Sequence, residues 1–262
     1  MGFAAVILLG RSARRGGEIS VKSSLIYYDT AILNPMCGRM SITQPLEAMA
    51  RLFDATPAND LPVVPNYNVC PTINIHTVVS AQGTRHLKAM RWGFVPHWYQ
   101  TMTDGPLLIN ARSETLAEKP AFREACRQRR CLIPADGFYE WSRTSRDKPI
   151  PYRVTRSDQQ PMVMAGIWQD WESAGNRITT CAIVTTDANA AMAKIHHRLP
   201  VILAPEHWPL WLGEAGIGAA KVMQPVASEV LDLRRVSTAV NSNRANGPEL
   251  WQPIGAGGCP EH

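Results

Sequence analysis

The feature that most constrains the fold of this chain is a series of short apolar stretches separated by turns, which starts near Met36. Stretches 162–171 and 178–185 flank a Ser-Ala-Gly-Asn turn and predict a long β-hairpin. Stretches 73–80 and 87–92 predict a second hairpin. Since strand and helix do not alternate regularly and no internal repeat is present, the pattern favours mostly antiparallel β structure.

Further stretches predict two more strands and two peripheral helices. Residues 131–134 and 137–141 predict strands around a turn. Residues 121–130 predict a basic helix, and 205–212 predict a short one. Helices this few and short are expected at the edge of the β structure.

A further helix is predicted over 45–54. Thr43 lies just before it, and a threonine hydroxyl is a common cap for the first turn of a helix. Four apolar residues recur at helical spacing and share one face: Leu46, Met49, Ala50 and Phe53. This face is expected to pack against the sheet.

Composition is that of a globular protein, with 45% hydrophobic and 19% charged residues. No apolar run approaches the ~18 residues that span a bilayer, so we expect a soluble protein without a membrane partner. The six cysteines are scattered and form no CxxC pair, which predicts neither a disulfide framework nor a structural zinc site and suits a reducing cytoplasm. A net charge of +5 is compatible with nucleic acid but is weak evidence alone.

The first 35 residues differ from the rest. Residues 3–10 form a short apolar run that arginines follow, which is the reverse of the order in a secretory signal. We interpret 1–35 as an extension, either a start assigned too far upstream or a propeptide. A single domain is predicted over 36–255, with a tail at 256–262, because no linker divides the intervening chain.

Four clusters of chemically capable residues lie between the apolar stretches: 37–39 (CGR), 108–115 (LINARSET), 136–141 (DGFYEW) and 195–203 (IHHRLPVIL). Singly, each also fits an ordinary structural role. Asn110 could satisfy a backbone group at a strand end, Glu140 could lie on a solvated strand face, and His196 and His197 could form a surface turn. A lone cysteine such as Cys37 is more often inert than catalytic.

Together with PNYNVCPT (65–72), RWGFVPHW (91–98) and VNSNRANGPEL (240–250), these clusters form seven motifs in a fixed order. In this respect the chain resembles the SOS-response-associated peptidase (SRAP) family, the HMCES/YedK-like abasic-site processing proteins. The resemblance extends from Met36 to Pro253. It implies a single α+β domain with mostly antiparallel β structure, a barrel-like core, peripheral helices and a groove for single-stranded DNA.

The resemblance also implies a reaction in which Cys37 must be the first residue. The α-amine of an N-terminal cysteine forms a Schiff base with the ring-opened aldehyde of an abasic site, and its thiol then closes a thiazolidine. An internal cysteine has an amide nitrogen and cannot do this. An α-amine has a reference pKa of ~7.7–8.0, against ~10.4 for lysine, so a useful fraction is unprotonated near neutral pH.

The other catalytic roles follow from the same resemblance. Glu140 matches the acid–base residue beside the amine, and Asn110 matches the group that orients the reacting centre. His196 matches the histidine that assists sugar ring opening and adduct reversal. A pKa near neutrality would suit His196 to proton transfer in both directions. His197 is treated as secondary.

Binding of single-stranded DNA requires cations and aromatic platforms. We predict DNA contacts from four residues: Arg39, Arg112, Trp98 and Arg198. Arg39 could instead lower the thiol pKa of Cys37. Trp92 and Phe94 fit core packing and DNA stacking equally well.

The leading hypothesis is therefore a crosslinking enzyme for abasic sites in single-stranded DNA, acting in the cytoplasm at the damaged nucleoid, with an associated lyase activity. We expect a monomer that uses no metal and no cofactor. Two alternatives stay open: a thiol autopeptidase in which Cys37 releases the extension, and a non-catalytic nucleic-acid-binding module. The true start, the preferred DNA context, the crosslink reversal rate and the reach of any peptidase activity do not follow from the sequence.

Overall fold

The computed structural model describes residues 38–58, 60–143 and 148–258, with side chains described through residue 254. Contacts divide the chain into Met1–Asn34 and Pro35–His262, and all described residues belong to the second unit. The predicted extension over 1–35 and the candidate nucleophile Cys37 lie outside the described residues.

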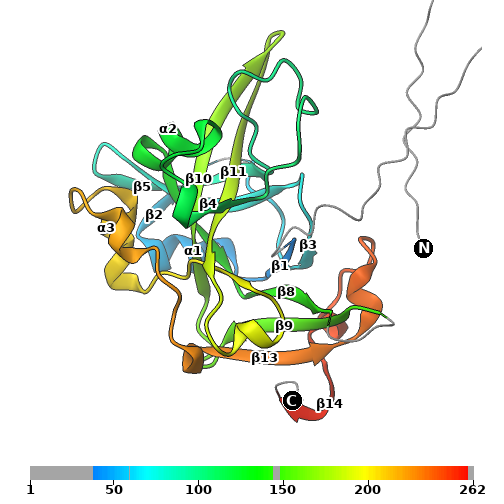
Figure 1. The fold of residues 1–262 in the computed structure, drawn as a ribbon. Coiled ribbons are helices and arrows are strands. Elements are labelled where there is room, and N and C mark those ends of the chain that lie inside the picture. The colour runs from blue at the N-terminus through cyan, green and yellow to red at the C-terminus, as the bar shows by residue number, and fades with distance from the viewer. Residues whose placement is uncertain (1–37, 59, 144–147, 259–262) are drawn as a thin grey trace, which may run out of the picture. The chain divides into compact units, whose positions relative to one another are not determined.

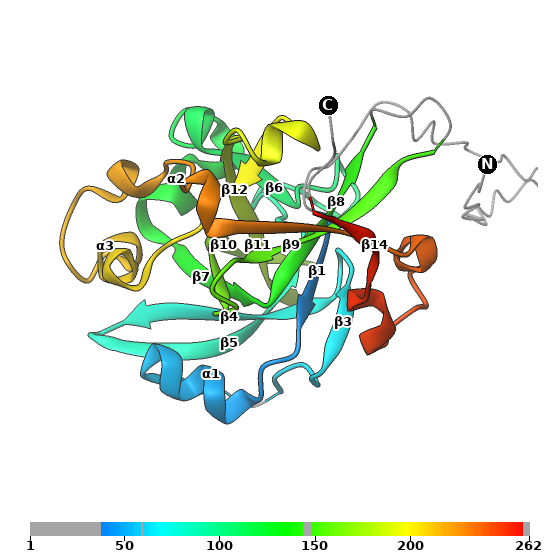
Figure 2. The same ribbon diagram turned by 90° about the horizontal axis from the view of Figure 1, so that it is seen from below.

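Two sheets organise this unit, and the first has six strands (Figures 1 and 2). In spatial order they are β14 (Pro253–Gly258), β13 (Leu231–Val236), β9 (Ile150–Arg156), β8 (Gly137–Ser142), β1 (Arg39–Ile42) and β3 (Asn66–Val69). All neighbours in this sheet are antiparallel. The sheet thereby joins the amino-terminal strand of the described chain to its carboxyl-terminal strands.

The second sheet contains a closed barrel. Its order is β12 (Arg198–Pro200), β11 (Asn176–Asp187), β10 (Met162–Ser173), β7 (Arg130–Ala135), β4 (Asn74–Ala81), β5 (Thr84–Trp92) and β2 (Ala55–Pro57). β11 also pairs with β5 in parallel, which closes a ring of the five strands β11, β10, β7, β4 and β5. The predicted single α+β domain with mostly antiparallel strands and a barrel-like core is confirmed.

Both predicted hairpins are present. β10 and β11 pair from Gly166 with Ile183 to Ser173 with Asn176, and they project as the long ribbon seen in Figure 1. Their turn has positive φ at Ala174 and Gly175, as a tight two-residue hairpin turn requires. β4 and β5 form the second hairpin.

Three α-helices lie outside the strands: α1 (Leu46–Phe53), α2 (Pro120–Gln128) and α3 (Trp208–Leu212) (Figure 2). Met49 and Phe53 of α1 are buried, as its apolar spacing predicts. The predicted cap of α1 is wrong. Pro45 occupies the N-cap without a side-chain bond, and the backbone N–H of Thr43 instead donates to Asp136 Oδ2 at 2.7 Å.

The strands β7 and β8 are nearly consecutive in the chain but belong to different sheets. The chain crosses between the sheets at Asp136 and Gly137. A Cβ at position 137 would lie 2.4 Å from the backbone oxygen of Val154, so only glycine allows β9 to approach β8 this closely. This crossing brings the Glu140 motif on β8 beside β1.

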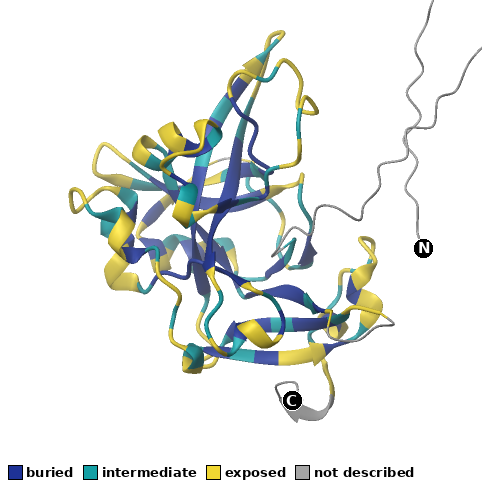
Figure 3. Ribbon diagram, in the orientation of Figure 1, coloured by how far each residue is buried: buried dark blue, intermediate teal, exposed yellow. Residues whose placement is uncertain are grey.

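The main core fills the barrel and the space between the two sheets (Figure 3). A second, smaller cluster packs on the six-stranded sheet and consists of Tyr139, Val236, Val240 and Leu250. Trp92 and Phe94 are 0% and 2% exposed, which assigns both to the core rather than to DNA stacking.

Candidate functional site

Glu140 lies on β8, next to the amino end of β1. Arg39, the first residue of β1, pairs with Tyr139, so Glu140 is one residue beyond the last recorded pair of these strands. Its side chain is only 5% exposed. A solvated strand face is therefore excluded, and a buried carboxylate is expected to have a functional or structural partner.

Arg39 is held by the protein itself. Its Nη1 donates to Asn68 Oδ1 at 2.9 Å and to the backbone oxygen of Val240 at 2.7 Å, and its Nη2 bonds the side chain of Asn243. These acceptors are neutral amides and carbonyls from β3 and from a segment about 200 residues later in the chain. The guanidinium therefore ties the start of β1 to the carboxyl-terminal region.

Asn68 completes this tie. It is 5% exposed, and its Nδ2 donates to the backbone oxygens of Ser242 at 2.9 Å and Ala245 at 2.8 Å. We call Arg39, Asn68 and residues 240–246 the amino-side anchor. The sequence predicts no role for residues 240–246. Their repeated asparagines, and those of 66–68, could have indicated a hydrogen-bonded contact between the two segments.

The amino-side anchor also reaches the residue after Glu140. Trp141 Nε1 donates to Asn241 Oδ1 at 2.7 Å, which fixes the indole while its ring stays partly exposed. Trp141 is not among the candidate residues that the sequence marks. Its place directly after Glu140, within the DGFYEW motif, was a signal that could have added it as a candidate.

The other side of the site is built around β11. β6 (Asn110–Arg112) pairs with β11 on one side, and β12 pairs with it on the other. Thr185 of β11 is opposite both Arg112 and Pro200, so the Asn110 segment and the His196 segment flank the same strand. The second and fourth sequence clusters are therefore neighbours in the fold.

His196 is half-buried, and its surroundings disfavour the protonated, positively charged form of the ring. Burial is the largest cause that lowers the pKa of His196 to about 4, and the positive charges of His197, Arg143 and Arg198 lower it further. The expected near-neutral pKa is therefore not found in the DNA-free protein. Arg143, whose charge acts on His196, directly follows β8. The His196 segment therefore lies near the end of the strand that carries Glu140.

The hydrogen bonds of His196 indicate its tautomer. The backbone N–H of Arg198 donates to Nδ1 at 3.1 Å, so the neutral ring carries its proton on Nε2. Nε2 is buried and has no hydrogen-bond partner among the described residues. The ring of His197 stacks on that of His196 with centroids 4.4 Å apart. The arrangement provides a neutral donor that a ligand oxygen could satisfy.

Arg198 is bound by carboxylates. It forms a two-pronged pair with Glu114, with N–O distances of 2.9 and 2.7 Å, and it also contacts Asp187. Its Nη2 further donates to the backbone oxygen of Thr185 at 2.9 Å, and the residue is 7% exposed. We call these contacts the histidine-side ion pairs. They hold Arg198 in the fold, and its predicted DNA contact stays a prediction.

Arg112 and Trp98 are the accessible members of the predicted DNA-binding set. Arg112 is exposed at the end of β6, and Trp98 is 45% exposed in the loop before it. Trp171 Nε1 donates to the backbone oxygen of Tyr99 at 2.9 Å, which holds this loop against the long hairpin. Both positions suit contact with a large partner.

The structure thus groups the candidate residues on two sides. Arg39 and Glu140 lie on neighbouring strands of one sheet, while Asn110, Arg112, His196 and Arg198 surround β11. Within the described part of the chain, no group of three or more His, Cys, Asp or Glu side chains could hold a metal ion. No helix there is long and apolar enough to cross a membrane.

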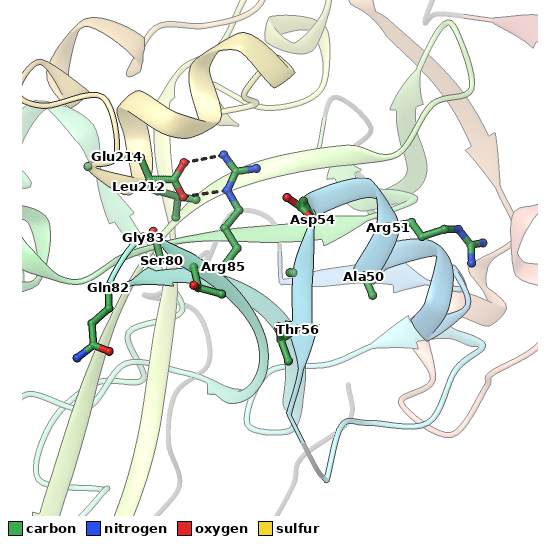
Figure 4. A pocket seen from close by; sticks show the side chains of 13 residues that line it. Ala50, Arg51, Asp54, Thr56, Ser80, Gln82, Gly83, Arg85, Leu212 and Glu214 are labelled. Atoms are coloured by element: carbon green, nitrogen blue, oxygen red, sulfur yellow. Dashed lines mark hydrogen bonds and ion pairs between the residues drawn. The ribbon is translucent and has the colours of Figure 1, made fainter.

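A wide hollow lies away from these residues (Figure 4). It measures about 1170 Å³ and is lined by residues of α1, the β4–β5 turn and the end of α3. Arg85 and Glu214 form a two-pronged ion pair in it, at 2.9 and 2.6 Å. None of the predicted site residues lines this hollow, and its wide, polar opening is unlike an enclosed catalytic pocket.

Comparisons with known proteins agree with the family resemblance. The chain is 36% identical to the abasic site processing protein YoqW of Bacillus subtilis over 222 residues, covering 82% of this chain and 98% of the relative. It is 32% identical to the abasic site processing protein YedK of Escherichia coli, covering 84% and 100%. The orangutan (Pongo abelii) abasic site processing protein HMCES is 29% identical, with 84% and 76% covered.

The fold has a solved counterpart as well. A protein from Bacteroides thetaiotaomicron superposes with a TM-score of 0.73 at 26% identity, covering 83% of this chain and all of the other. The family model described as "SOS response associated peptidase (SRAP)" matches residues 36–243, which is most of the chain. This chain therefore belongs to the SRAP family.

Proposed function

We infer that this protein forms a covalent crosslink with abasic sites in single-stranded DNA through Cys37. The observation that carries this proposal is the burial of Glu140 next to the start of β1. The first residue of β1, Arg39, is only two residues after Cys37 in the chain. The relatives are named abasic site processing proteins, which supports the same substrate. Membership of the SRAP family supports a role in DNA damage and repair.

The reaction requires a free α-amine on Cys37. The amine attacks the C1′ aldehyde of the opened sugar and loses water to give an imine. The Cys37 thiol then adds across the C=N bond: sulfur bonds the carbon, nitrogen takes the proton, and the thiazolidine ring closes. No electron acceptor and no cofactor is consumed, so the atoms balance with water as the only by-product.

Three side chains serve these steps. Glu140 accepts and returns the protons of the amine, and Asn110 orients the reacting centre. Neutral His196 donates from Nε2 to the sugar oxygen during ring opening. DNA phosphates nearby would raise the pKa of His196 above its value in the free protein, since negative charge favours the protonated ring.

The same imine permits β-elimination at the sugar, which would give the protein a lyase activity. Thiazolidine closure competes with that step and shields the lesion. The protein would then act at single-stranded DNA in the nucleoid during the SOS response, as a monomer in the cytoplasm.

A peptidase activity is the second candidate, and the residues before Cys37 favour it. Hydrolysis of the Met36–Cys37 bond would release the extension and expose the amine that crosslinking needs. The Cys37 thiol would be the nucleophile, with His196 and Glu140 assisting. Initiation at Met36 followed by methionine removal gives the same amino terminus without self-cleavage.

The crosslink is testable on a denaturing gel. Protein that begins at Cys37 is mixed with single-stranded DNA carrying one abasic site and is then heated. We expect a heat-stable adduct whose mass equals protein plus DNA minus one water. Cys37→Ser, which keeps the amine but loses the thiol, should give only a transient imine. Absence of any adduct from the wild-type protein would refute the proposal.

A further inference from the structure

A groove of about 410 Å³ lies at the edge of the six-stranded sheet. Its apolar floor is formed by side chains of β9, β13 and β14, including Pro151, Val236 and Ile254. Two cations, Lys148 and Arg235, stand at its border. We call it the Lys148–Arg235 groove.

The groove is close to Glu140 through the strand register. Glu140 pairs with Tyr152 on β9, and Tyr152 pairs with Arg235 on β13. Since neighbouring strands lie ~4.8 Å apart, the backbones of Glu140 and Arg235 are separated by about 10 Å. Trp141 is in turn opposite Pro151 of the groove floor. Because side chains alternate between the two faces of a strand, Trp141 and Pro151 project from the face opposite to Glu140. The groove therefore lies within two strands of Glu140, beside the strand position of the partly exposed Trp141.

Its charge is uncompensated. Lys148 and Arg235 are both exposed, and within the described residues neither side chain forms an ion pair or a hydrogen bond. Among the described residues, no acidic side chain lines the groove. The terminal guanidinium nitrogens of Arg39 and Arg198, by contrast, are bound by protein acceptors. The positive charge at the border of the groove is thus available to a partner.

The remaining lining supplies hydrogen-bonding groups. Ser237 and Thr238 contribute hydroxyls beside the apolar floor. A nucleotide presents the matching chemistry: a phosphate for the cations and hydroxyls, and a flat base and sugar for the apolar surface. We favour a nucleotide over an acidic peptide or a lipid headgroup because the proposed substrate of the neighbouring site is DNA.

We propose that the Lys148–Arg235 groove binds a nucleotide that flanks the abasic site on one side, as part of the same bound strand. The proposal rests on the proposed function of the neighbouring site. In this proposal the bound DNA strand leaves the candidate site across the β-strands β8, β9 and β13. The groove contributes affinity and position but takes no part in the chemistry.

The test uses the double variant Lys148→Gln/Arg235→Gln. Its matched control, Arg51→Gln/Lys221→Gln, removes two exposed positive charges that do not line the groove. Affinity for undamaged single-stranded DNA is measured against salt. Crosslinking rates are measured with three oligonucleotides, in which the abasic site is flanked on both sides, on one side only, or on the other side only.

We expect the groove variant to bind about tenfold more weakly and to lower the slope of log K against log salt by about 1.4, as two lost phosphate contacts on a single strand would. The crosslinking defect should vanish with whichever one-sided oligonucleotide lacks the flank in the groove. Unchanged affinity and slope, or an equal defect with all three oligonucleotides, would overturn the proposal.

The two proposals fail separately. If the wild type forms no adduct, the function is wrong, and the salt-dependent binding of undamaged DNA still decides whether the groove holds a strand. If the wild type crosslinks and the groove variant matches it in affinity and slope, only the groove is wrong.

Discussion

Both sides of the candidate site are secured by an arginine, but with different partners. The amino-side anchor holds Arg39 with neutral acceptors, namely the Asn68 amide and backbone carbonyls of 240–246. The histidine-side ion pairs hold Arg198 with the carboxylates of Glu114 and Asp187. The strength of hydrogen bonds to neutral acceptors changes little with acid or salt, whereas the strength of ion pairs depends on both.

This difference suits the two sides to different tasks. The amino side must hold the first strand of the domain, which would otherwise fray as chain ends do. The histidine side lies where the negatively charged DNA strand is expected to bind. In the free protein the carboxylates of Glu114 and Asp187 balance the charge of Arg198. The arginines that the sequence marks as DNA contacts therefore divide into those held by the fold, Arg39 and Arg198, and exposed Arg112.

The largest effect is expected at Glu140, on the strand next to the start of β1. Glu140→Gln should slow crosslinking roughly 100- to 1,000-fold, the range lost with a general acid–base group, while affinity for undamaged DNA stays unchanged. Single-turnover rates measure the first quantity and equilibrium binding the second. Glu172→Gln, exposed on the long hairpin, is the control. A Glu140→Gln protein as fast as the wild type would remove Glu140 from the chemistry.

The histidine side is broken by Arg198→Met. We expect a loss of about 2 kcal/mol in the free energy of unfolding, less than the ~3–5 kcal/mol of a fully buried pair, because the Glu114 and Asp187 side chains are 42% and 82% exposed. The hydrogen bond from Arg198 is the largest cause that lowers the pKa of Glu114 below 4.5.

The sign of the pH dependence follows from that shift. A carboxyl whose pKa is depressed in the folded state stabilises the fold above its unfolded pKa and loses this contribution as the pH falls through the folded value. Denaturant titrations should therefore show the full Arg198→Met penalty above about pH 4.5 and a shrinking one below it. A penalty that is constant across this range would contradict the ionic assignment.

The amino side is broken by Asn68→Ala. The change leaves the carbonyls of Ser242 and Ala245 without their donor and should cost about 1–2 kcal/mol in the free energy of unfolding, with no dependence on pH between 4 and 7. Hydrogen exchange at residues 38–42 should rise together with this loss. Asn74→Ala, at an exposed position, should stay within ~0.5 kcal/mol of the wild type. Equal exchange in both variants would dismiss the anchor.

Much of the fold was predictable because its signals are local. The β10–β11 and β4–β5 hairpins and the buried face of α1 follow from periodicity and turn residues within a few positions. Closure of the barrel was not predictable, since it depends on parallel pairing between β5 and β11. The paired residues of these strands lie about 90 positions apart in the sequence.

The sequence marks candidate site residues, and their membership of a site stays a prediction; how the fold holds them could not be read from the sequence. Arg39 and Arg198 read as phosphate ligands because a sequence does not display their partners, which lie 201 and 84 residues away in the chain. The low pKa of His196 likewise depends on burial and on charges that only the fold assembles. Trp141 was missed because its anchor, Asn241, lies in a motif without an assigned role.

The smallest effect on stability is expected at Arg112. Arg112→Gln should change the free energy of unfolding by less than ~0.5 kcal/mol, since the residue is exposed and has no partner to lose within the described residues. The slope of log K for single-stranded DNA against log salt should nevertheless fall by about 0.7, as one lost phosphate contact predicts. Arg127→Gln on α2 is the control, and the same slope for both variants would leave Arg112 outside the DNA contact.

The requirement for a free amine on Cys37 is tested most directly by adding one glycine in front of it. This change converts the amine to an amide and keeps the thiol, Glu140, Asn110 and His196. Protein that begins at Cys37 should form the heat-stable adduct with single-stranded DNA carrying an abasic site, and the glycine-extended protein should form none, as read by intact mass. An adduct of equal yield and stability from the extended protein would contradict the N-terminal mechanism.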